Sequence, residues 1–148
     1  MDDNLREKAK TLIREQRNCV LATALENRPH CSLMAYVTNS SCDEIYLMTL
    51  KDSRKYRNMS ENPAVSLLID TRQGASRSEP AETMALTLTG RFQTIIEDTE
   101  RERIRRELSR KHPGLKEFFE NPEGEPVRII IESILLMEGP TKALYGAF

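Results

Sequence analysis

The fold of this chain is decided by the stretch Met48-Thr49-Leu50-Lys51-Asp52-Ser53-Arg54-Lys55-Tyr56-Arg57-Asn58, which continues to Asn62-Pro63. A strand-like run of mostly apolar residues, Ile45 to Leu50, stops at a polar turn. A short helix is predicted after the turn, with Ser53 as its N-cap. The helix is expected to end before Pro63, because the residue that precedes a proline avoids the α region.

Arg54 and Lys55 occupy the first helical positions after Ser53. Two cations there oppose the helix dipole, which favours negative charge at this end. A bound anion would compensate, because free backbone amides and two cationic side chains can hold a phosphate together. The stretch therefore predicts a phosphate site. The alternative is a solvated basic turn, partly balanced by Asp52 and Glu61, and these residues alone leave both interpretations open.

The whole chain has 148 residues and a net charge of −1, with 30% charged and 39% apolar residues. This length suits one domain with a core, and the charge gives no general attraction to nucleic acid. The acidic start is unlike a signal peptide, and the apolar runs are too short to span a membrane. Three cysteines without a Cys-x-x-Cys spacing favour reduced thiols, so we expect a cytoplasmic protein without a membrane partner.

The order of the elements predicts a mainly β protein with peripheral helices. Periodicity and turn residues indicate strands over 19–24, 31–38, 45–50, 64–70 and 84–96, with a bulge at Gly90 in the last of these. With a last strand over 127–137, six strands in all argue for a closed antiparallel barrel, and a sandwich is the alternative. We expect a single domain, 1–148, made of a helix 4–17, the barrel 18–97, a helical insert 98–120, a last strand 127–137 and a tail 138–148. The tail is expected to dock on the domain or on a second subunit.

Several common kinds of site are missing from the sequence. None of the six glycines forms a Gly-x-Gly-x-x-Gly motif or a P-loop, so these types of nucleotide binding are not expected. His30 and Cys31 have no ligand partner at a metal spacing, so we interpret His30 as a turn residue, Cys31 as a core thiol, and expect no metal site. The long polar loop 71–83 suggests a functional segment. If the protein is an enzyme, a cofactor is expected to supply the chemistry.

The chain resembles the pyridoxamine 5′-phosphate oxidase-like flavoproteins, which share an FMN-binding split β-barrel. The resemblance covers roughly residues 5 to 97 in the order of the elements. It is sharpest where Met48-Thr49, Ser53-Arg54-Lys55 and Asn62-Pro63 match an aromatic-Thr pair, a Ser-Arg-Lys and an Asn-Pro at the same separations in the oxidases. The resemblance implies a six-stranded antiparallel split β-barrel with FMN as cofactor.

Site residues follow from the resemblance position by position. It implies that Arg54 and Lys55, in the turn that begins at Ser53, bind the FMN phosphate. It implies that Met48 and Thr49 contact the flavin by backbone and hydroxyl. The isoalloxazine ring would be lined by residues of the second strand, which are Ser32, Leu33 and Met34. In this family the site lies between two subunits of a homodimer, so residues 85–91 would face the partner's flavin.

The sequence also departs from the oxidases themselves. Ser32 stands where they have an FMN-binding arginine, Val37 where they have a substrate-binding lysine, and Ala85 where a flavin-contacting glutamine is expected. Their C-terminal Arg-x-His has no counterpart, since neither residue type occurs after Arg128. The resemblance therefore implies a kept scaffold and phosphate site, together with loss of the pyridoxal-phosphate site.

These observations favour a cytoplasmic, homodimeric FMN-dependent oxidoreductase that acts on an unknown small molecule and is not a true pyridoxamine 5′-phosphate oxidase. A non-catalytic carrier or sensor of flavin, deazaflavin or haem with the same fold is the alternative. A third hypothesis is a nucleic-acid-binding module that uses cations between Lys51 and Arg57. The chain has no tryptophan, and Tyr56 is the one aromatic residue in that cluster, which argues against nucleic acid.

Overall fold

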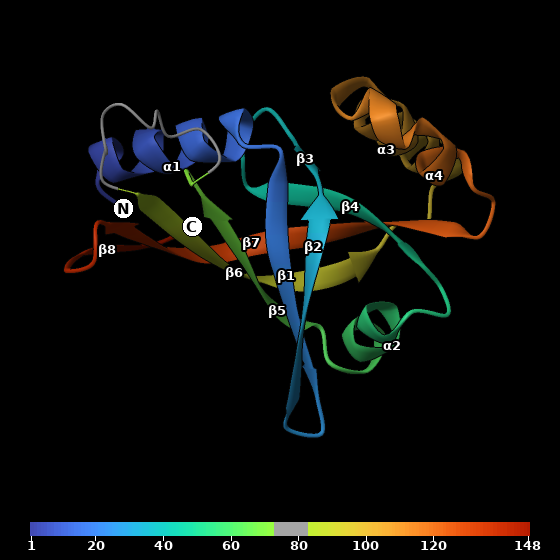
Figure 1. Cartoon of the computed structure of the whole chain (residues 1–148), viewed down its shortest axis with the longest axis horizontal. Coiled ribbons are helices and arrows are strands. Elements are labelled where there is room, and N and C mark those ends of the chain that lie inside the picture. The colour runs from blue at the N-terminus through green and yellow to red at the C-terminus, as the bar shows by residue number, and fades with distance from the viewer. Residues whose placement is uncertain (73–82) are drawn as a thin grey trace.

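The computed structural model describes residues 1–72 and 83–148. Figure 1 shows a curled sheet with helices at its edges. The helices are α1 (Asp3–Glu15), α2 (Arg54–Glu61), α3 (Asp98–Lys111), the 3-10 turn η1 (Pro113–Leu115) and α4 (Lys116–Glu120). The strands are β1 (Asn18–Leu25), β2 (Arg28–Ala35), β3 (Val37–Thr38), β4 (Glu44–Leu50), β5 (Ala64–Asp70), β6 (Met84–Thr94), β7 (Gly124–Glu138) and β8 (Lys142–Ala147).

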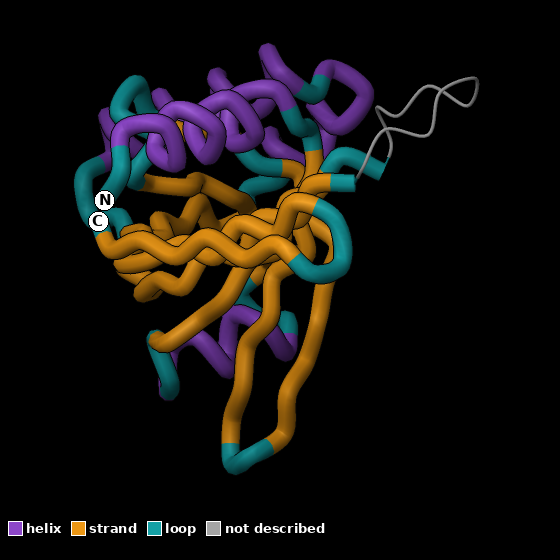
Figure 2. Tube along the Cα trace, turned by 90° about the vertical axis from the view of Figure 1, so that its left-hand side faces the viewer, coloured by secondary structure: helices purple, strands orange, loops and turns teal. Residues whose placement is uncertain are grey.

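The strands form one antiparallel sheet in the order β2-β1-β5-β6-β7-β4-β3, and β8 pairs with β7. The predicted strand 31–38 changes partner at Tyr36, because β2 pairs with β1 while β3 pairs with β4. This stretch of chain thus links the two edges of the sheet and makes it a split barrel. Figure 2 shows the β1–β2 hairpin projecting from the rest of the sheet. The prediction of a mainly β split barrel is confirmed.

The strand count was wrong at the C-terminal end of the chain. The strand predicted over 127–137 begins at Gly124 and is followed by β8. Together with the division of the predicted strand 31–38 into β2 and β3, this gives eight strands among the described residues instead of six. The tail docks on its own domain as a strand, with Lys142 opposite Glu138 and Ala147 opposite Ser133. Edge pairing supplies backbone partners for β7, and this long-range effect has no local sequence signal.

The main core lies between the curled sheet and α1. Leu5, Ala9, Leu12 and Ile13 are buried on one face of α1, as the helical period predicts. A second apolar cluster joins the sheet edge to the helical insert, and it contains Val37, Tyr46, Met48, Ile95, Ile104, Leu108 and Phe119.

The bulge predicted at Gly90 is confirmed by a register shift between β6 and β7 at Thr89/Gly90. Such a shift bends a strand and increases its twist, as the curl of this sheet requires. The loop 71–83, for which a functional role was expected, lies almost entirely outside the described residues. No helix in the described part of the chain has the length and apolar character needed to cross a membrane.

Candidate functional site

The start of α2 is built by hydroxyl groups at the end of β4. Ser53 is the N-cap, as predicted, and its Oγ accepts from the Tyr56 amide at 3.3 Å and donates to the Leu50 carbonyl at 2.7 Å. Thr49 Oγ1 lies 2.8 Å from the same oxygen. Because the single Ser53 proton goes to Leu50, the Thr49 hydroxyl is the donor in that contact. These bonds fix the direction in which the first turn of α2 points.

Two asparagines hold α2 against β1. The Asn58 side chain donates to Thr23 Oγ1 at 3.1 Å, and both residues are buried. The Asn62 side chain donates to the Ala24 carbonyl at 3.0 Å. Asn62 therefore does more than end the helix before a proline, because it fixes α2 relative to the first hairpin.

The hairpin turns over two residues, Glu26 and Asn27, with φ of 53° and 62°. Positive φ at both positions is typical of the tight turns that join twisted strands. The chain is extended again at Arg28, three residues before the start of the predicted strand 31–38, and Arg28 pairs with Leu25. His30 is therefore a strand residue and not a turn residue.

Cys31 lies on the exposed face of β2 and not in the core. Met34 is buried and Ser32 is half-buried, whereas Cys31 and Leu33 are exposed on the opposite face. The interpretation of Cys31 as a core thiol is wrong, because alternation defines two faces and the barrel buries the other one. His30 lies on the same face as Ser32, with 3.3 Å between His30 Nε2 and Ser32 Oγ.

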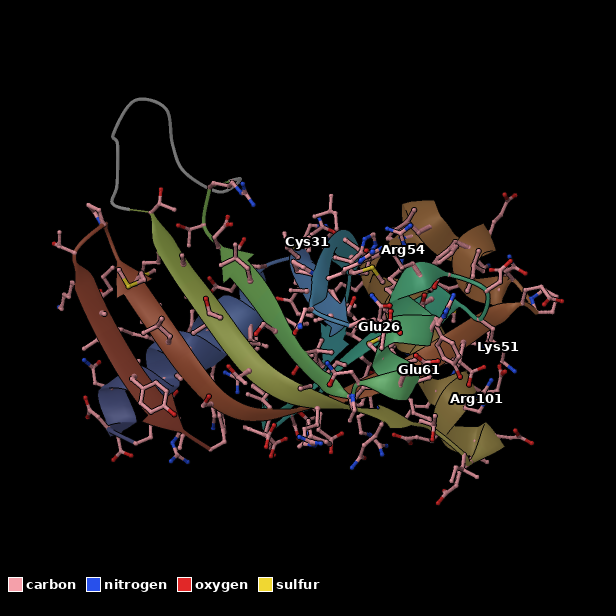
Figure 3. The ribbon with its side chains drawn as sticks, turned by 90° about the horizontal axis from the view of Figure 1, so that it is seen from below. Glu26, Cys31, Lys51, Arg54, Glu61 and Arg101 are labelled. Carbon is pink, nitrogen blue, oxygen red and sulfur yellow. The ribbon has the colours of Figure 1, made fainter. Side chains whose placement is uncertain are left out.

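A cleft of about 400 Å³ separates α2 from the hairpin. Figure 3 shows Arg54 on the side of α2 nearer the hairpin, with Glu26 close by. Within the described part of the chain, no carboxylate lies within 4.0 Å of the guanidinium groups of Arg28, Arg54 or Arg57. The cleft is lined by Leu25, Glu26, Arg28, Pro29, His30, Asp52, Ser53, Arg54, Arg57 and Asn58. Unpaired guanidinium groups in one cleft are suited to binding an anion.

The structure brings together only part of the predicted site. Ser53 and Arg54 line the cleft, whereas Lys55 is half-buried on α2 and is not among the lining residues. Ser32 lies on the same face of β2 as the lining residue His30. Leu33 is 71% exposed on the other face of the sheet.

The side chains of Met34, Met48 and Thr49 are almost completely buried. Met34 belongs to the main core, and Met48 packs in the second cluster, where its sulfur lies 3.9 Å from Arg105 Nη1. The Thr49 hydroxyl is engaged with Ser53. Any contact of Met48 with a ligand would therefore use its backbone, which is the kind of contact that the family resemblance implies.

The structure adds Arg28, His30 and Arg57 to the cleft. The resemblance pointed to none of them. Arg57 is part of the basic run after Ser53, whereas Arg28 lies outside the strands predicted from the sequence. The available signal was the alternation of β2, which places Arg28, His30 and Ser32 on one face once the strand is known to start at Arg28.

A separate group of charges lies on the other side of α2 (Figure 3). Glu125 of β7 is buried, receives two hydrogen bonds from Arg101, and lies 3.6 Å from Lys51 Nζ. Hydrogen bonding from Arg101 lowers the pKa of the Glu125 carboxyl below its usual range. Lys51 is exposed, pairs with Glu125 and is not among the residues that line the cleft.

A family model described as pyridoxamine 5′-phosphate oxidase matches residues 5–133 of this chain. The chain belongs to this family. The cleft and its arginines are therefore interpreted as part of a pyridoxamine 5′-phosphate oxidase-like protein. The comparison with curated proteins gives no match.

Solved structures show how widely this fold is shared. A haem-binding protein from Mycobacterium smegmatis has a TM-score of 0.82 at 18% identity, over 96% of this chain but 57% of its own. An FAD-binding protein from Mesorhizobium loti gives 0.71 at 16% identity, over 88% of this chain and 91% of its own. The haem storage protein HutZ from Vibrio cholerae gives 0.71 at 18% identity, over 90% and 94%. At these identities the similarity shows the fold alone.

Proposed function

We propose that this protein binds FMN and acts as an oxidoreductase on a small organic molecule. The observation that carries the proposal is the cleft at the start of α2, where Arg54 points to a ligand space without a carboxylate partner among the described residues. Family membership supports a flavin as the ligand. Three free thiols among the described residues support a cytoplasmic location.

In this proposal the chain supplies binding and orientation. Ser53, Arg54 and Lys55 hold the phosphate, while Thr49 fixes the Ser53 hydroxyl and with it the start of α2. Ser32 and the backbones of Leu33, Met34 and Met48 form the surroundings of the ring. A bound flavin supplies hydride exchange at its N5 atom. Val37 and the lack of a C-terminal Arg-x-His support a substrate other than pyridoxamine 5′-phosphate.

We also propose that the protein is a homodimer with its flavin sites at the subunit interface. One row of residues crosses six strands, because the registers place Leu33, Val20, Leu68, Thr87, Leu135 and Tyr145 side by side from β2 to β8. Five of the six are apolar or aromatic, and Leu33 and Tyr145 are 71% and 70% exposed. A contiguous apolar surface of this kind is typical of an interface.

The test is a fluorescence titration of FMN against the wild type and an Arg54→Ala, Lys55→Ala double variant. Each lost charge-assisted hydrogen bond is worth about 1.5–3 kcal/mol, so we expect at least about a tenfold rise in Kd. An Arg106→Ala, Arg110→Ala double variant, with both exposed arginines on α3, is the matched control. A double variant that binds FMN like the wild type contradicts the site assignment.

A non-catalytic binding protein is the second candidate. It is favoured by the buried, internally bonded state of Thr49 and Met48, which leaves few side chains to act on a substrate. Haem-binding proteins share the fold, so haem and deazaflavin are alternative ligands. The visible absorption spectrum of the purified protein distinguishes flavin, deazaflavin and haem. A flavin that neither NADH nor NADPH nor another donor reduces would favour the non-catalytic role.

A further inference from the structure

The missing arginine at Ser32 leaves the phosphate end of a flavin without one of its expected cations. Ser32, His30 and Arg28 lie along one face of β2. Arg28 is the residue at which this face reaches the hairpin end of the cleft. A cation has therefore not been lost from this face. It lies four residues earlier on the same strand.

The second cation comes from α2 itself. Arg57 follows Arg54 by three residues, a spacing that puts two side chains on one face of a helix, and both line the cleft. Lys55 is not among the lining residues. The cleft is thus bounded by Arg28 from one wall and by Arg54 and Arg57 from the other.

The charges of the cleft favour an anion. Three guanidinium groups face two carboxylates, those of Glu26 and Asp52, and no arginine of the three is within 4.0 Å of a carboxylate in the described residues. Like charges gathered in this way repel one another until an anion neutralises them. A phosphate monoester carries close to two negative charges at pH 7 and offers three acceptor oxygens.

The walls of the cleft are held in place before any ligand arrives. Asn58 and Asn62 connect α2 to β1 by hydrogen bonds of 3.1 and 3.0 Å, and the tight turn at Glu26-Asn27 fixes the start of β2. Because the walls are already fixed, binding of an anion has to order the arginine side chains but not the backbone, and the planar guanidinium fork matches phosphate geometry.

We infer that Arg28 and Arg57, together with Arg54, bind the terminal phosphate of the flavin, and that Arg28 takes the place of the arginine replaced by Ser32. This inference rests on the proposed function, because it names further residues of the same site. It makes Arg28 a determinant of the preference for FMN over riboflavin, which has the same ring system and no phosphate.

The test compares Kd values for FMN and riboflavin in the wild type, Arg28→Gln and Arg57→Gln. We expect about a tenfold or larger rise in the FMN Kd of each variant, while the riboflavin Kd stays within about twofold. Arg106→Gln on α3 is the matched control and leaves both values unchanged. Arg28→Lys keeps the charge but not the fork, so we expect an intermediate FMN Kd. Unchanged FMN binding in Arg28→Gln, or equal losses for both flavins, would overturn the inference.

A second measurement separates this inference from the proposed function. Inorganic phosphate is added to ¹⁵N-labelled protein while the amide signals of Ser53 to Arg57 are followed. Shifts that occur in the wild type and disappear in Arg28→Gln support a phosphate site at these arginines. If the same protein binds no flavin, the proposed function fails and the arginines hold the phosphate of another ligand. A wild type that binds FMN but shows the same phosphate shifts in Arg28→Gln overturns the inference and leaves the proposed function standing. If the wild type shows no shifts, the inference fails as well.

Discussion

At the scale of single residues, Glu125 shows how the helical insert is attached to the barrel. This residue is 6% exposed at the start of β7, directly opposite Thr49 of β4. Arg101 of α3 donates two hydrogen bonds to it and a third, at 3.1 Å, to the Ile95 carbonyl. Glu125 therefore connects α3 to the same end of β4 from which α2 starts.

We predict that Glu125→Gln lowers the free energy of unfolding by about 1–3 kcal/mol at pH 7, because the hydrogen bonds from Arg101 lose their charged acceptor. The pKa of Glu125 is lowered in the folded state, so its contribution is complete above its ordinary value of 4.5 and is lost as the pH falls through the folded pKa. Urea denaturation at several pH values checks this. The variant should lose less stability than the wild type between pH 6 and about pH 3, and Glu61→Gln, an exposed carboxylate on α2, is the control. Equal pH dependence in the two proteins would contradict the prediction.

At the scale of elements, the long β6–β7 pair determines the curl of the sheet. The register shifts at Thr89/Gly90, and the backbones approach so closely that a Cβ on Gly90 would lie 2.5 Å from the Ile130 carbonyl oxygen. It would also lie 2.8 Å from Ile129 Cγ2. A backbone oxygen in a paired strand cannot move aside as a flexible side chain can. Gly90 is thus required by a close approach in the sheet.

We predict that Gly90→Ala destabilises the protein by about 1–3 kcal/mol through overpacking. Gly114→Ala is the matched control, because nothing lies within 4 Å of a Cβ at that position. There the smaller entropy of the unfolded chain makes the change neutral or slightly stabilising. Thermal and urea unfolding of both variants measures the difference. If the two variants are equally stable, the close approach at Gly90 is not a constraint in solution.

At the scale of the whole molecule, the surface row from Leu33 to Tyr145 is the feature that a single domain does not account for. It is continuous through the registers of six strands, and its two ends are the most exposed residues of the row. Leu33 belongs both to this row and to the residues that the family resemblance places near the flavin ring. The proposed dimer and the proposed flavin site therefore meet at β2.

We predict that a Leu33→Glu, Tyr145→Glu double variant is monomeric at concentrations where the wild type is a dimer, because two carboxylates would be buried without partners. Sedimentation velocity measures the state. Ile96→Glu is the matched control, since Ile96 is 87% exposed and lies outside the row, and it should leave the dimer intact. A monomeric wild type would contradict the proposed dimer, and a dimeric double variant would exclude this surface as its interface.

Local chemistry determined those parts of the protein that depend on neighbours in the chain. The buried stripe of α1, the Ser53 cap and the end of α2 before Pro63 all follow from helix geometry over a few residues. The bulge at Gly90 followed from a glycine within a strand pattern. These features together with the motif spacing were enough to predict the split barrel and to propose a phosphate site at the start of α2.

Only the tertiary structure decided which residues line the cleft beside α2. An alternating strand has two equivalent faces in the sequence, so Cys31 and Ser32 were indistinguishable until the barrel buried one face of β2. β8 formed because β7 offers an edge, and this edge exists only once distant strands have paired. Arg28 came to lie opposite Arg57 for the same reason, since Asn58 and Asn62 hold α2 against β1 across more than 30 positions of the chain. Contacts between such distant residues depend on the whole sheet, and so no local pattern contains them.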